Sequence, residues 1–163
     1  MFAVDANFIL DLAEPREDAL DALEVIRRRS RGAQLLITPT AWGEVMNTAF
    51  NSANDDDRAC AQRALAGMRT WDMEAVELSD MDEVFAESIA GRLLDEGIIP
   101  LEERHDARIV AEAAVLGCQL LVSSDGHVLH AERARLAAVL LAHRVEAVAI
   151  KSPRDIVREF AGR

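Results

Sequence analysis

Short apolar runs and longer amphipathic stretches alternate along the chain. Each apolar run is only a few residues long and is bounded by helical or polar sequence, which is typical of strands. The predicted strands are Phe2–Val4, Gln34–Ile37, Ala75–Leu78, Gln119–Val122 and Ala147–Ile150. Strands that alternate with helices predict an α/β fold in three layers, with a parallel sheet covered by helices on both faces.

The stretches between the apolar runs have helical periodicity. The predicted helices are Glu17–Arg31, one that begins at Thr38-Pro39, Met81–Glu96, Glu102–Leu116, His130–His143 and Pro153–Phe160. Thr38 suits an N-cap and Pro39 suits the first helical position, so the start of the second helix is well defined. The acidic run at positions 55–57 predicts a solvated loop or a helix interruption.

Asp106 stands at the centre of the apolar stripe of the helix predicted for Glu102–Leu116. At about 100° per residue, Ile109 and Val110 lie within about 60° of Asp106, whereas Glu112 points the other way. An isolated ionised carboxylate on a buried face would cost several kcal/mol. Asp106 must therefore be paired, protonated or bound to a ligand.

Three more acids lie near the carboxyl ends of predicted strands, where open parallel α/β sheets bind their ligands. Asp5 directly follows the first strand, and Asp125 follows the fourth after Ser123 and Ser124. Glu44 lies in the first two turns of the helix that follows the second strand. These acids and Asp106 can therefore share one end of the sheet.

Three of the four acids also have an ordinary structural interpretation. Asp5 suits the cap of a helix that begins near Asn7, and Asp125 before a glycine suits a turn or a cap. Glu44 lies near a helix N-terminus, where a surface acid stabilises the helix dipole. Only Asp106 has no such alternative, because its own helix face is apolar.

Four carboxylates in one crevice repel one another. At about 5 Å and an effective dielectric constant of 20, each pair costs on the order of 3 kcal/mol. A divalent cation removes this cost, and hard oxygen ligands suit Mg²⁺ or Mn²⁺. Such a site, with Asp5, Glu44, Asp106 and Asp125 as metal ligands, typically serves phosphoryl chemistry with water activated by the metal.

Composition indicates one globular domain over residues 1–163, with half of the residues hydrophobic. No apolar run reaches the length of a membrane span, and the first residues do not resemble a signal peptide. Cys60 and Cys118 lack metal-ligand spacing and are expected to be buried thiols, which suits a cytoplasmic protein. The net charge of −11 argues against a non-specific nucleic-acid binder, although an enzyme can reach phosphates through metal ions.

Four segments resemble the PIN domains, a family that includes the VapC-type toxins. They are "VDANFIL" (Val4–Leu10), "ITPTAWGEV" (Ile37–Val45), "HDARIVAEAAVLG" (His105–Gly117) and "LLVSSDGHV" (Leu120–Val128). The acidic positions of the family fall on Asp5, Glu44, Asp106 and Asp125. The small polar residue beside the first acid falls on Asn7, and the Ser or Thr before the last acid falls on Ser123.

This resemblance implies a five-stranded parallel sheet of order 3-2-1-4-5 and cleavage of RNA that depends on Mg²⁺ or Mn²⁺. The resemblance to the toxin branch also implies a homodimer and an inhibitory antitoxin. The chain departs from many members after the last acid. It has His127 where a second acid is common and Val128 where an aromatic is common.

Two other function classes remain open from the sequence. The first is a non-catalytic PIN module that binds RNA or protein. The second is a phosphatase or a receiver-type phospho-acceptor domain, for which Lys151 is the available lysine. The smaller candidates also keep two interpretations: Asn7 caps the first helix or orients Asp5 or a water, and Ser123 caps or contacts the site.

Overall fold

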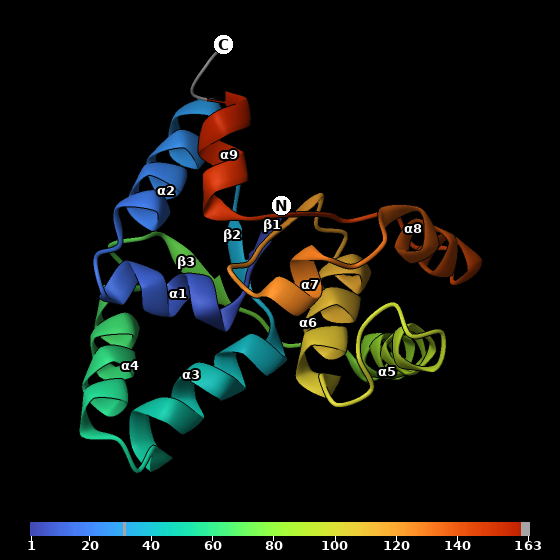
Figure 1. Ribbon diagram of the computed structural model, residues 1–163, viewed down its shortest axis with the longest axis horizontal. Coiled ribbons are helices and arrows are strands. Elements are labelled where there is room, and N and C mark those ends of the chain that lie inside the picture. The colour runs from blue at the N-terminus through green and yellow to red at the C-terminus, as the bar shows by residue number, and fades with distance from the viewer. Residues whose placement is uncertain (31, 161–163) are drawn as a thin grey trace.

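The computed structural model describes residues 1–30 and 32–160, and a parallel sheet runs through its centre (Figure 1). Its strands are β1 (Phe2–Val4), β2 (Leu35–Ile37), β3 (Met73–Ala75), β4 (Leu120–Val122) and β5 (Ala149–Lys151). They form one five-stranded sheet of order β3-β2-β1-β4-β5, and all four pairings are parallel. The fold class and strand order predicted from the sequence are therefore confirmed.

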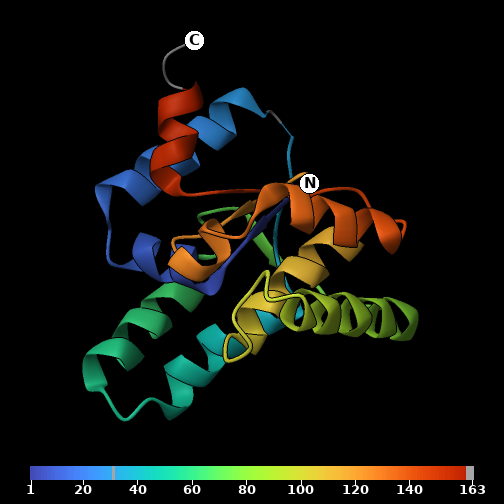
Figure 2. The same cartoon turned by 45° about the vertical axis from the view of Figure 1, so that its right-hand side comes forward.

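Helices cover both faces of this sheet. They are α1 (Ala6–Ala13), α2 (Glu17–Arg29), α3 (Pro39–Asn51), α4 (Asp55–Gly67), α5 (Asp80–Asp95), α6 (Arg104–Val115), α7 (Gly126–Leu129), α8 (Arg133–Ala142) and α9 (Pro153–Phe160). In Figure 1, α1, α2 and α9 lie on one side of the strands, and α5, α6 and α8 lie on the other. The turned view in Figure 2 shows α5 and α8 side by side, and α3 beside α4, which also packs against α1.

The central strands supply the core because they are buried on both faces. Every residue of β2 and β4 is buried, as expected for continuous apolar runs in a parallel sheet. On α6, Ile109 and Val110 are also buried, so the apolar stripe faces the interior as its periodicity predicts. No helix in the described part of the chain is long and apolar enough to cross a membrane.

The acidic run at positions 55–57 is not a loop but the first turn of α4, so that prediction was wrong. Asn54 caps this helix, and its side chain accepts a hydrogen bond from the Asp56 backbone N–H at 2.9 Å. Acids in a first turn are stabilised by the helix dipole. The charge run therefore marks a helix start, with the cap just before it.

Several other helices and strands begin or end a few residues away from the predicted positions. Strand β3 is Met73–Ala75 rather than Ala75–Leu78, and two of its three residues are exposed at the edge of the sheet. Helix α2 ends at Arg29, and Arg31, the predicted end, lies outside the described residues. The short helix α7 was not predicted, and it begins directly after Asp125.

Candidate functional site

Asp5, Ser123 and Asp125 are joined at the carboxyl ends of β1 and β4. These strands pair in parallel, and the Asp5 backbone N–H donates to the Val122 carbonyl at 3.0 Å. The Ser123 hydroxyl donates to Asp5 Oδ2 at 2.6 Å and accepts from the Asp125 backbone N–H at 3.0 Å. Both Asp5 and Ser123 are buried, so Ser123 fixes one carboxylate and the start of the next loop together.

Asp125 combines a cap with a position at the site. Its Oδ1 accepts from the His127 backbone N–H at 2.7 Å, which caps α7. Its Oδ2 is 3.5 Å from the Asn7 amide nitrogen, so Asn7 contacts the fourth-strand acid rather than Asp5. Asp5 occupies the N-cap position of α1 but makes no side-chain capping bond. The capping interpretation therefore applies to Asp125 and not to Asp5.

Glu44, on α3, contacts His105 in the first turn of α6. Its Oε1 lies 2.8 Å from His105 Nδ1, while the His105 ring is largely exposed. Burial raises the pKa of Glu44, and the contact with His105 lowers it in part. Since Glu44 and His105 belong to different helices, this contact joins α3 to α6 at the site.

In the described part of the chain, the buried side-chain oxygen or nitrogen that lacks a hydrogen-bond partner belongs to Asp106. Its Oδ2 is buried and has no hydrogen-bond partner there. Burial, with a smaller contribution from the charges of Asp125 and Asp5, raises the pKa of Asp106 to about 7. The paired, protonated or ligand-bound state required by the sequence pattern is therefore still required by the structure.

Asp5 has a raised pKa for the same reasons. Burial raises the pKa of Asp5 most, the hydrogen bond from Ser123 lowers it, and the charges of Glu44 and Asp125 raise it, so that it reaches about 6. The charges of neighbouring acids thus help to raise the pKa values of Asp5, Glu44 and Asp106. The structure brings them to one end of the sheet and leaves them destabilised when they are all ionised.

The donor type fits a hard divalent cation, but the side chains do not form a finished ligand set. Among the described residues, no three His, Cys, Asp or Glu side chains converge closely enough to hold a metal ion. The unpartnered oxygen of Asp106 and the mutual repulsion of the acids are what favour a cation. The site therefore fits a divalent cation in its charge and in the chemistry of its oxygen donors.

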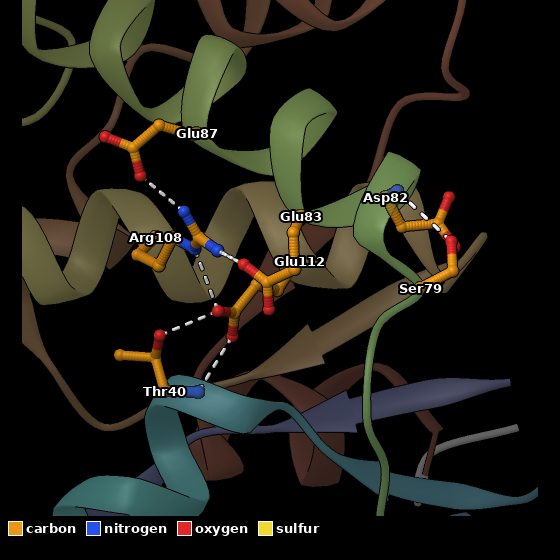
Figure 3. Close-up of polar contacts among 7 residues, drawn as sticks. All are labelled: Thr40, Ser79, Asp82, Glu83, Glu87, Arg108 and Glu112. Atoms are coloured by element: carbon orange, nitrogen blue, oxygen red, sulfur yellow. Dashed lines mark hydrogen bonds and ion pairs between the residues drawn. The ribbon is translucent and has the colours of Figure 1, made fainter.

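Sequence reasoning missed Glu112, another buried acid on α6, whose side chain is 1% exposed. The helical periodicity predicted correctly that Glu112 points away from Asp106. That side of α6 is not exposed, however, because α5 and the start of α3 cover it (Figure 3). The spacing of Arg108 and Glu112 at i and i+4 was the available signal. An open cleft of about 630 Å³ between α5 and α6 runs past these residues to His105.

Lys151 is the lysine that a phospho-acceptor site would need. It ends β5, and its ammonium pairs with the carboxylate of Glu159. It also lies 5.4 Å from the centre of the Phe160 ring. Its ammonium is therefore paired with Glu159 of α9 and not with one of the four site acids, which disfavours the phospho-acceptor class.

The fold is PIN-like, and comparison with solved structures finds chains of similar fold. The crystal structure of VapBC2 from Rickettsia felis, bound to a DNA fragment from its promoter, matches with a TM-score of 0.62. That match covers 93% of this chain and 97% of the matched chain at 12% identity. VapBC-1 from nontypeable Haemophilus influenzae matches with a TM-score of 0.56, covering 94% and 98% at 15% identity.

No family model and no curated protein sequence matches the chain. At 12 and 15% identity, the two structural matches establish the fold. The resemblance to PIN domains, including the VapC-type toxins, is thus confirmed in the arrangement of the strands and helices. The fold alone does not determine the chemistry, which depends on the side chains of the site.

Proposed function

We propose that the chain is a metal-dependent endoribonuclease, with its chemistry at Asp5, Glu44, Asp106 and Asp125. The observation that carries this proposal is the buried Oδ2 of Asp106, which has no partner among the described residues and lies in the field of the other acids. A cation satisfies this oxygen and removes the repulsion at once. The PIN-like fold supports the same class of reaction.

The four acids would hold Mg²⁺ or Mn²⁺, and the smaller polar residues would set their orientation. The ion supplies activation of water and stabilisation of charge during hydrolysis of a phosphodiester. Ser123 holds Asp5 in place through its hydroxyl, and Asn7 contacts Asp125. His105 holds Glu44 from α6 and lies exposed, where it can meet a substrate phosphate.

The proposed binding partners of this chain are suggested by the solved structures of similar fold. The matched structures are VapBC complexes, one of them bound to promoter DNA. We infer that this chain acts as one PIN-like domain over residues 1–163, as the toxin of a toxin–antitoxin pair. An inhibitory antitoxin, a homodimer, an RNA substrate and a cytoplasmic location all belong to this proposal.

The test is cleavage of a panel of defined RNAs by the pure protein with Mn²⁺. We expect cleavage with Mn²⁺, none in EDTA, and a loss of at least about a hundredfold in Asp106→Asn, because removal of a ligand charge weakens the metal site. Asp21→Asn, an exposed acid on α2, is the matched control and is expected to cleave normally. Equal cleavage by wild type and Asp106→Asn would refute the proposal.

The second candidate is a PIN module that binds RNA or protein without cleaving it. It is favoured by one observation, namely that the acids do not converge on a common point in the described residues. This candidate predicts that Mn²⁺ leaves the melting temperature unchanged, whereas a metal site predicts an increase. A melting curve with and without 1 mM Mn²⁺ therefore separates the two candidates.

A further inference from the structure

Glu112 has an arrangement of contacts that is unusual for a buried acid. Its Oε2 accepts from the Thr40 backbone N–H at 3.0 Å, and its Oε1 accepts from the Thr40 hydroxyl at 2.7 Å. The same Oε1 accepts from Arg108 Nε at 3.0 Å. With its side chain 1% exposed, Glu112 is a charged group that has been removed from water and fully supplied with donors.

Arg108 provides the balancing charge and connects a third helix. Its two terminal nitrogens pair with Glu83 and Glu87 of α5, while its Nε pairs with Glu112 (Figure 3). Figure 3 shows these side chains converging from α5 and α6 toward Thr40 at the start of α3. The buried carboxylate thus adds to the cap that Thr38 supplies, since Thr38 accepts the Ala41 N–H and Glu112 accepts a second free backbone N–H, that of Thr40, in the first turn of α3.

The position of Thr40 connects this cluster to the proposed metal site. Thr40 and Glu44 are four residues apart, so they lie on the same face of α3. On α6, His105 and Glu112 are seven residues apart and also share a face. The two helices are therefore joined twice along one line, by Glu112 with Thr40 and by His105 with Glu44. The His105 contact is exposed, so the buried contact is the one that fixes the register of α3.

We propose that Glu112 is a positioning residue, which fixes α3 against α6 through Thr40 and thereby places Glu44 beside Asp106 for metal binding. This inference rests on the proposed function, because it assigns a purpose to the position of Glu44. Glu112 does not touch the ion or the substrate. It acts through Thr40 and α3, and the Arg108 guanidinium pairs with its carboxylate.

Mn²⁺ affinity, measured from the free Mn²⁺ signal in electron paramagnetic resonance, tests this role. Glu112→Gln keeps the shape but has one acceptor oxygen, so either the Thr40 N–H or the Thr40 hydroxyl and Arg108 lose their partner. We expect about tenfold weaker Mn²⁺ binding, the usual effect of losing an outer-shell partner. Glu87→Gln also removes a partner of Arg108 but leaves Thr40 untouched, so its affinity is expected to stay within about twofold.

A double-mutant cycle separates positioning from general support of the fold. In a Glu44→Gln background the carboxylate to be positioned is gone, so Glu112→Gln should weaken Mn²⁺ binding no further. An equal loss in both backgrounds, or no loss in Glu112→Gln, overturns the inference. Should Glu112→Gln fail to fold, Thr40→Val removes one donor of the same contact, and the same cycle applies to it.

The outcome for the proposed function is read from different variants. If wild type binds Mn²⁺ no better than Asp106→Asn, the metal site itself is wrong and the positioning role falls with it. If wild type binds and Asp106→Asn does not, the metal site stands. The behaviour of Glu112→Gln in the cycle then decides the positioning role alone.

Discussion

At the scale of single residues, α6 carries two buried acids that the chain treats in opposite ways. Glu112 accepts three hydrogen bonds, two from Thr40 and one from Arg108. Asp106, six residues earlier, keeps a buried Oδ2 without a partner in the described structure. Since the fold fully satisfies one buried carboxylate of α6, the unsatisfied one is best explained by a ligand that satisfies it. A buried acceptor otherwise costs about 1–3 kcal/mol.

The unsatisfied state predicts that neutralising Asp106 stabilises the protein when metal is removed. We expect Asp106→Asn to raise the free energy of unfolding in EDTA at pH 8 by about 1–2 kcal/mol, a figure reduced for solvent screening around a partly exposed side chain. Thermal denaturation measures it, with Asp21→Asn as the control of unchanged stability. A lower melting temperature for Asp106→Asn would mean that its carboxylate has a structural role.

The raised pKa values also predict the pH dependence of the metal-free protein. Asp5 and Asp106 have pKa values of about 6 and 7 in the folded state against a usual value of 3.8, so the folded state binds more protons between these limits. Stability must therefore fall as the pH rises from 6 to 8. We expect a higher melting temperature at pH 6 than at pH 8 in EDTA, and a smaller difference in Asp106→Asn. A melting temperature that rises with pH in this window would contradict the assignment.

At the scale of helices and strands, the sequence predicted best where one period dominates. Strand β1 and helix α9 have the predicted bounds, and Thr38 caps α3 as expected, accepting from the Ala41 N–H. Strand β3 was misplaced because two of its three residues are exposed, so its sequence shows little of the apolar pattern that marks a buried strand. Helix α4 was missed because three aspartates resemble a loop unless the Asn54 cap before them is recognised.

The cap of α4 gives a prediction at this scale. Asn54→Ala removes the acceptor for the Asp56 N–H and should lower the free energy of unfolding by about 1 kcal/mol. Chemical denaturation monitored by circular dichroism measures this loss. Asn54→Ser keeps a capping oxygen and is expected to restore most of the stability. Equal losses in the two variants would show that the cap is not what holds this helix start.

Part of the site could be predicted from the order of the strands and helices, and part could not. Parallel strands bring their carboxyl ends to one edge, so Asp5, Asp125 and Glu44 could be placed together from topology alone. The period of one helix shows that Glu112 points away from Asp106 but cannot show that α5 covers that side. Contacts such as that of Glu112 with Thr40 depend on how three helices pack together, and the periodicity of one helix carries no information about that packing.

At the scale of the whole molecule, the charge is unevenly distributed and mostly negative. Residues 1–125 contain 11 Lys or Arg and 25 Asp or Glu, whereas residues 126–163 contain 7 and 4. A net charge of −11 repels a polyanion at long range. Contact with RNA must then depend on the metal site and on local cations rather than on a basic surface.

This charge distribution predicts weak binding of RNA in the absence of metal. In EDTA, we expect a dissociation constant for a 20-nucleotide RNA weaker than about 10⁻⁴ M, the weak end of the range for non-specific binding. Fluorescence anisotropy with Asp106→Asn, which cannot cleave the probe under this account, measures it directly. Micromolar binding in EDTA would instead favour the RNA-binding module without catalysis.

The central claim is that the acids at the end of the sheet form a metal site, and calorimetric titration of Mn²⁺ at pH 6.5 tests it most directly. Asp106 has a pKa of about 7 and is largely protonated at this pH, so metal binding should release a proton. Titrations in two buffers of different ionisation enthalpy count the protons released. We predict saturable binding with proton release in wild type, and neither in Asp106→Asn. Saturable binding that is unchanged in Asp106→Asn, or no binding in wild type, would contradict the account.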